Sequence, residues 1–153
     1  MYSTKKTLNY LGYPFNYRPY CQVFLSLIFL TCLVSDSITQ IVINLLLIVN
    51  GIYLVFILKE KYKTERPYNN SQLKIDYYPE SYDIPSGHSF FSVYWLLILL
   101  YKRIPYTSPL IFYLSLVPFS RFMLGVHTVK AVCLGSVIAV VWFLIWLLLH
   151  NFY

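Results

Sequence analysis

Three short polar clusters in this chain contain the residue types that phosphoryl chemistry needs. They lie at 59–67, 85–88 and 120–127, and together they supply several cations, two histidines and two serines. Cationic side chains bind phosphate oxygens, and two imidazoles can act as nucleophile and general acid. The clusters therefore predict transfer of a phosphoryl group, provided that the fold brings them together.

The first cluster offers a clamp for an anion. Lys59 and Arg66 are seven residues apart, with Lys63 between them. They share one helical face if the preceding helix continues for two turns past the membrane boundary. An arginine can bind phosphate bidentately, whereas a lysine acts as a point charge. Ordinary juxtamembrane charge is the competing interpretation for this cluster alone.

The second cluster stands where a helix is expected to begin. Ser86 can cap that helix, whose free N–H groups and positive dipole end would bind an anion. Gly87 lets a ligand approach the backbone closely, and His88 is placed to donate a proton. A cap followed by an incidental histidine explains this cluster equally well when it is taken alone.

The third cluster adds a cation, Arg121, and a second imidazole, His127. Asp76, Glu80 and Asp83 are not grouped as a divalent-metal site would require. We therefore predict no metal and no other cofactor.

Composition indicates where this chemistry takes place. Of 153 residues, 58% are hydrophobic and 12% are charged, which is too apolar for an ordinary soluble domain. We predict one integral membrane domain over 1–153. The net charge of +6 favours a phosphate or lipid headgroup as ligand, because a chain buried in hydrocarbon is a poor candidate for binding nucleic acid.

The apolar runs predict an all-α bundle of about five transmembrane helices. These helices are expected at 20–34, 38–58, 87–101, 109–119 and 128–149. Alternating helix direction places all three clusters on one side of the membrane. The 59–85 connection then forms an active-site loop, and 1–19 is expected to lie along the interface.

The ordered motifs resemble the signature of the type 2 phosphatidic acid phosphatase superfamily, membrane lipid phosphate phosphatases related to vanadium haloperoxidases. They read Lys, six residues, Arg-Pro; then Pro-Ser-Gly-His; then Ser-Arg, five residues, His. The resemblance implies that His127 is a nucleophile forming a phosphohistidine and that His88 is the general acid. It also implies metal independence. The phosphate-binding residues that it implies are Lys59, Arg66, Ser86, Gly87 and Arg121.

One departure from the family pattern concerns the nucleophile. Four residues after this histidine the family has an aspartate that orients the ring, but here that position is Ala131. By analogy with serine-protease triads, the loss would slow the reaction on the order of 10,000-fold. Three alternatives follow: the enzyme is impaired, another acceptor such as Glu80, Asp83 or a backbone carbonyl substitutes, or the chain is a natural or engineered inactive form.

A second departure lies before the first motif. The family core has three spans there and this chain has two, so the core lacks the first helix. Counted by positive charge, the site would face the cytoplasm. The resemblance places it on the extracytoplasmic or lumenal side instead, and we follow the resemblance because phosphate-binding cations inflate the charge count.

These observations predict a membrane phosphatase for a lipid phosphate or diphosphate, such as phosphatidate or a polyprenyl diphosphate. Its partners would be that substrate and the surrounding membrane lipids. Two alternatives remain: a transferase that passes the phosphoryl or headgroup moiety to an alcohol, and a catalytically degenerate protein that only binds phosphorylated lipid. The sequence makes no prediction of oligomeric state.

Overall fold

The described part of the chain is entirely helical. The computed structural model describes residues 28–67, 82–123 and 125–152. Within these ranges there are five helices and no strand, which confirms the predicted all-α class. The size of the full bundle and the missing first helix stay predictions.

Internal contacts divide the chain into two compact units, Met1–Leu33 and Val34–Tyr153, which we describe separately. The described residues of the first unit belong to a helix at 28–34, inside the predicted span 20–34. The predicted interfacial segment 1–19 lies outside the described residues. The single-domain organisation stays a prediction.

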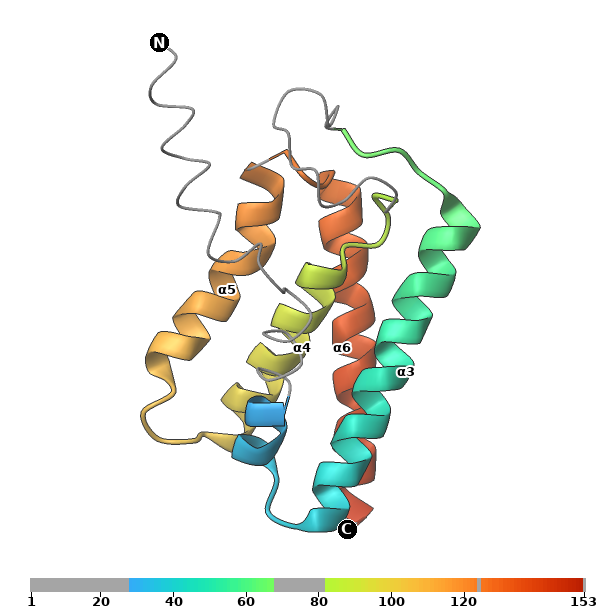
Figure 1. The fold of residues 1–153 in the computed structure, drawn as a ribbon. Helices are drawn as coiled ribbons and strands as arrows, with labels where there is room; N and C mark the ends of the chain where they lie inside the picture. The colour runs from blue at the N-terminus through green and yellow to red at the C-terminus, as the bar shows by residue number, and fades with distance from the viewer. Residues whose placement is uncertain (1–27, 68–81, 124, 153) are drawn as a thin grey trace. The chain divides into compact units, whose positions relative to one another are not determined.

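The second unit contains the four helices that carry the polar clusters (Figure 1). They are α3 (Ile38–Tyr62), α4 (Gly87–Lys102), α5 (Ser108–Met123) and α6 (Val129–Phe152). Helix α4 packs against both α5 and α6, and α3 packs against α6. The side chains of α4 are accordingly the most deeply buried, with Ile98 and Leu99 fully enclosed. In this unit α4 is the central helix.

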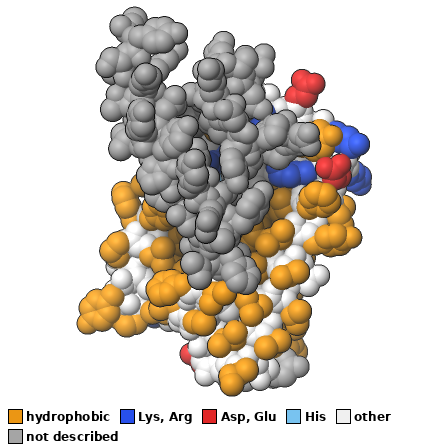
Figure 2. Space-filling model, in the orientation of Figure 1, with side chains coloured by type: hydrophobic (Ala, Val, Ile, Leu, Met, Phe, Trp, Pro, Cys, Tyr) orange, Lys and Arg blue, Asp and Glu red, His pale blue; other side chains and the backbone are white. Residues whose placement is uncertain are grey.

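Two of these helices have membrane-spanning dimensions. Helix α3 has 25 residues and α6 has 24, and both are long and apolar enough to cross a bilayer. Large apolar side chains such as Phe56, Phe112 and Leu148 are exposed. Figure 2 shows hydrophobic side chains spread along the described surface, whereas Lys and Arg gather near one end of that face. This distribution favours association with a membrane.

The two 16-residue helices are shorter than a standard span. Helices α4 and α5 extend roughly 24 Å at about 1.5 Å per residue. Helix α5 continues through Pro118 to Met123, beyond the predicted end at 119, and so brings Arg121 into its last turn. Helix α3 likewise extends to Tyr62, beyond the predicted end at 58.

Two glycines allow the helices to approach closely. A Cβ at Gly135 would lie 2.4 Å from the backbone oxygen of Ser86, and one at Gly51 would lie 2.5 Å from the Phe90 ring. Small residues at such crossings let helix backbones meet, as in many membrane bundles. The start of α4 is therefore seated directly on α6.

The other end of the unit is joined by polar contacts. Asn44 is buried, accepts a hydrogen bond of 2.6 Å from the Trp146 indole and donates one of 2.9 Å to Ser35 Oγ. Lys102 forms an ion pair with Asp36 nearby. Asn44 of α3 thus faces α6.

Candidate active site

The three polar clusters meet at one end of the second unit. Figure 1 shows the end of α3, the start of α4, the end of α5 and the start of α6 at that end. The charges of Arg121, Arg66 and Lys59 all act on the ring of His88, and so does His127. His88 therefore lies within electrostatic range of all four groups, as the alternation of helix directions predicts.

His127 forms a buried pair with Asp83. Its Nδ1 lies 2.8 Å from Asp83 Oδ1, and the two side chains are 2% and 1% exposed. An ionised carboxylate can only accept a hydrogen bond, so the proton of the neutral ring resides on Nδ1. The Nε2 lone pair is then the nucleophilic one.

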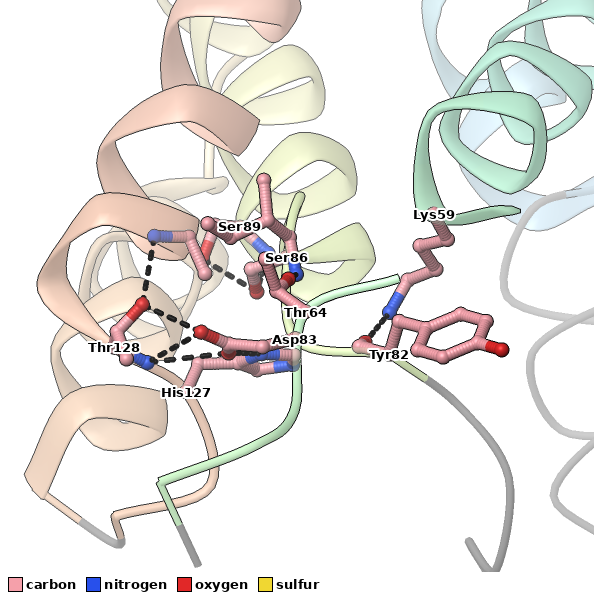
Figure 3. Close-up of polar contacts among 10 residues, drawn as sticks. Lys59, Thr64, Tyr82, Asp83, Ser86, Ser89, His127 and Thr128 are labelled. Carbon is pink, nitrogen blue, oxygen red and sulfur yellow. Dashed lines mark hydrogen bonds and ion pairs between the residues drawn. The ribbon is translucent and has the colours of Figure 1, made fainter. Parts of the chain in front are cut away.

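Asp83 is itself held at the start of α6 (Figure 3). The Thr128 backbone N–H donates to Oδ1 at 3.2 Å, and the Thr128 hydroxyl donates to Oδ2 at 2.5 Å. The same hydroxyl accepts a hydrogen bond of 3.2 Å from the N–H of Ala131. A carboxylate at this position also gains from the positive end of the α6 dipole.

The protonation of His127 follows from this setting. Burial is the main cause, and it lowers the pKa of His127 from its ordinary 6.5 to about 4. The hydrogen bond with Asp83 acts in the opposite direction, while the positive charges of Arg66 and Lys59 lower the pKa further. The imidazole is therefore neutral near pH 7, as a nitrogen nucleophile must be.

The segment that carries Asp83 is anchored on the residues following α3. The Asp83 N–H donates to the Thr64 carbonyl at 2.8 Å, and the Ile84 N–H donates to Thr64 Oγ1 at 3.1 Å. The Lys59 ammonium donates to the carbonyl of Tyr82 (Figure 3). These contacts fix the Asp83 backbone independently of its contact with His127.

The structure corrects one expectation about the first cluster. Helix α3 ends at Tyr62, because Lys63 adopts a left-handed conformation (φ 44°) and caps the helix. Arg66 therefore does not share a helical face with Lys59, and the two-turn extension is wrong. Pro67 also disfavours helical geometry at Arg66, the residue before it. The charges of both cations nevertheless act on both histidines.

The second cluster begins α4 as predicted. Ser86 is the N-cap and accepts hydrogen bonds from the Ser89 N–H and hydroxyl at 3.3 and 3.0 Å. Its own N–H donates to the Ala131 carbonyl at 3.0 Å, so the groups of Ser86 serve mainly to fix the helix start. The amides of Gly87 and His88 belong to the first turn, where N–H groups have no intrahelical acceptor. They are the better placed donors for an anion.

Arg121 is tied to His127 through the backbone. Its carbonyl accepts hydrogen bonds of 3.2 Å from both Val126 and His127. Gly125 permits the turn between them because it adopts φ 65°, which is strained for other residues. The end of α5 therefore links the backbone of Arg121 to that of His127.

Sequence reasoning named some of these partners and missed others. Asp83 was one of three alternative acceptors, and Glu80 lies outside the described residues. Thr128 was not singled out, although a threonine directly before an apolar run is a recognisable cap. No sequence signal pointed to Thr64. Within the described ranges, no three metal-binding side chains gather, and metal independence stays a prediction.

Comparison with known proteins gives one match. The family model of the PAP2 superfamily matches residues 27–153, which include all three clusters. No curated protein and no solved structure matches the chain. Members of this superfamily are generally phosphatases that act on phosphate esters. Because the match covers most of its length, the chain belongs to the PAP2 superfamily.

Proposed function

We propose that this protein is a multi-pass membrane phosphatase that hydrolyses a lipid phosphate or diphosphate through a phosphohistidine on His127. One observation carries the proposal: a neutral, buried His127, oriented by a carboxylate, lies within electrostatic range of His88 and of the cations around it. This arrangement combines a nucleophile, a proton donor and positive charge in one place.

The cations and the start of α4 would bind the phosphate. Lys59, Arg66 and Arg121 supply positive charge, which an anion in a site shielded from water feels strongly. The first amides of α4, those of Gly87 and His88, would donate to further phosphate oxygens. Ser86 contributes by holding that helix start against Ala131.

The reaction would proceed in two steps. His127 Nε2 attacks phosphorus, the bond between phosphorus and the leaving oxygen breaks, and His88 donates a proton to that oxygen. The negative charge of the bound phosphate favours the protonated form of His88, which burial and the nearby cations otherwise disfavour. The neutral His88 then accepts a proton from water as the water oxygen attacks phosphorus. The bond between nitrogen and phosphorus breaks, and inorganic phosphate and neutral His127 are released.

A lipid substrate fits the surroundings of the site. Helices α3 and α6 both reach the site end and are long and apolar enough to span a bilayer. A lipid could then enter sideways from the membrane, with its tail on apolar helix faces and its phosphate among the cations. We place this end on the extracytoplasmic or lumenal side, in keeping with the motif resemblance.

The test is phosphate release from detergent-solubilised lipid phosphates and diphosphates in the presence of a chelator. We expect release by the wild type and none by His127→Ala. His150→Ala is the matched control, because it removes a histidine from α6 at the end away from the site, and it should remain active. Equal activity in His127→Ala, or release that requires a divalent metal, would overturn the proposal.

The transferase alternative shares the same first step. Adding an acceptor alcohol and analysing the products separates the two, because a transferase yields a new phosphoester at the expense of inorganic phosphate. The binding-only alternative was based on Ala131, and the contact between Asp83 and His127 weighs against it. A protein that binds phosphorylated lipid but forms no phosphoenzyme would support it nevertheless.

A further inference from the structure

We propose that Asp83 replaces the orienting carboxylate that the family pattern places at position 131, and that it positions His127 from the segment before α4. This inference rests on the proposed function for its kinetic consequences. The juxtaposition itself, a 2.8 Å contact between two buried side chains 44 residues apart in sequence, stands on geometry alone.

The hydrogen bonds of Asp83 suit this role. Oδ1 lies against His127 Nδ1 and the Thr128 N–H, and Oδ2 accepts from the Thr128 hydroxyl. A buried carboxylate is costly unless donors surround it, and here both oxygens have them. Its backbone is anchored separately through Thr64, so the carboxylate presents a fixed acceptor to the ring.

Position 131 performs a different task in this chain. Ala131 is fully buried, its N–H donates to Thr128 Oγ1, and its carbonyl accepts from Ser86. A single hydroxyl oxygen, that of Thr128, therefore contacts both Asp83 and the backbone of Ala131. An aspartate at 131 would bring a second negative charge close to the first, which disfavours ionisation of both. The absence of a carboxylate at 131 is thus consistent with its presence at 83.

A purely structural role for Asp83 would give different results. If the carboxylate served only to anchor the start of α6, its loss would lower stability without changing the tautomer of His127. If it orients the ring, its loss would lower kcat far more than it changes KM, because substrate binding depends on the cations rather than on the tautomer.

The kinetic test uses five proteins: the wild type, Asp83→Asn, Asp83→Ala, Ala131→Asp and the double variant Asp83→Ala/Ala131→Asp. We expect Asp83→Asn to lower kcat by about 1,000- to 10,000-fold with KM nearly unchanged, by analogy with the loss of the orienting aspartate in serine proteases. Ala131→Asp alone should not raise kcat. The double variant should have a higher kcat than Asp83→Ala, because it has a carboxylate near His127 again, now at position 131.

The second readout does not depend on activity. With ¹⁵N-labelled histidine, the wild type near pH 7 should show His127 with a protonated Nδ1 and an unprotonated Nε2, the signal being assigned by its loss in His127→Gln. Observation of the Nε2–H tautomer in the wild type would overturn the inference, even if Asp83→Asn failed to fold.

These outcomes separate the inference from the proposed function. Wild-type kcat in Asp83→Asn together with inactivity of His127→Ala would remove Asp83 from the mechanism and leave the phosphatase intact. Absence of phosphate release from every form, with the Nδ1–H tautomer present, would remove the phosphatase and leave the positioning of His127 by Asp83. Thermal unfolding of each variant in detergent serves as the control for folding.

Discussion

The buried imidazole of His127 makes the stability of the protein depend on pH. Its pKa is lowered to about 4, mainly by burial, whereas in the unfolded chain it titrates near 6.5. Between these values the unfolded chain binds more protons than the folded one. The contribution of this residue to stability is therefore complete above pH 6.5 and is lost as the pH falls towards 4.

The corresponding prediction compares the wild type with His127→Gln. We expect the wild-type unfolding temperature in detergent to fall more steeply between pH 6.5 and 4 than that of the variant, whose side chain does not titrate. Parallel curves for the two proteins would mean that His127 has an ordinary pKa in the folded state.

Thr128 supports the carboxylate and the helix at once. Thr128→Val removes the hydroxyl that donates to Asp83 and accepts from Ala131. We expect a loss of about 1–3 kcal/mol in unfolding free energy, since a hydrogen bond to a charged group and a helix cap are both lost. The proposed phosphatase activity should also decrease. Thr128→Ser keeps the hydroxyl and is the matched control; equal stability of the two variants would contradict this role.

At the scale of single residues, the sequence shows the motif positions directly but does not show which residues contact them. His88, His127 and Arg121 follow from residue type and spacing. The pairing of Asp83 with His127 could only be offered as one of several alternatives, because it joins segments 44 residues apart through a contact that the fold creates. The hydrogen bonds that Thr64 accepts from Asp83 and Ile84 also join segments that the fold brings together.

At the scale of helices, the close contact between the start of α4 and α6 requires that position 135 has no side chain. A Cβ at Gly135 would meet the Ser86 carbonyl oxygen at 2.4 Å, and a backbone atom cannot move aside as a flexible side chain can. Ser86 also donates to the Ala131 carbonyl one turn earlier, so both contacts fix the start of α4 on α6.

Gly135→Val should therefore separate the second cluster from the third. We expect a loss of about 1–3 kcal/mol, typical of overpacking, together with reduced phosphatase activity. Val137→Leu enlarges a side chain on the same helix at a position that is 58% exposed, and it should change neither property. An equally small effect of both substitutions, measured by thermal unfolding and phosphate release, would contradict the close crossing.

Helix ends were harder to predict than the helices themselves. The apolar runs identify the positions of α3 to α6, because hydrophobic length is visible in composition. The end of α3 depends instead on the left-handed conformation of Lys63, a residue type that gives no such signal. Because Lys63 ends the helix, Arg66 lies in the non-helical segment that follows.

At the scale of the second unit, the two ends of the helices perform different tasks. The site end gathers His88, His127 and the cations, whereas the other end contains Asn44, Trp146 and the ion pair between Lys102 and Asp36. In a membrane, hydrogen bonds between helices help to hold them together where the hydrophobic effect between helices is weak. The second end therefore stabilises the bundle without taking part in the proposed reaction.

The bond between Asn44 and Trp146 tests this division. A double-mutant cycle with Asn44→Ala and Trp146→Phe should give a coupling energy of about 0.6 kcal/mol and no more than about 1.7 kcal/mol, the average and the maximum found for hydrogen bonds between membrane helices. The kcat of each variant should stay close to the wild-type value, because neither residue lies at the site end. Asn44 is buried, so its single substitution should destabilise more than the coupling energy alone, as the indole loses its acceptor. A coupling energy near zero, or a kcat that falls in parallel with stability, would mean that the two ends are not separable in this way.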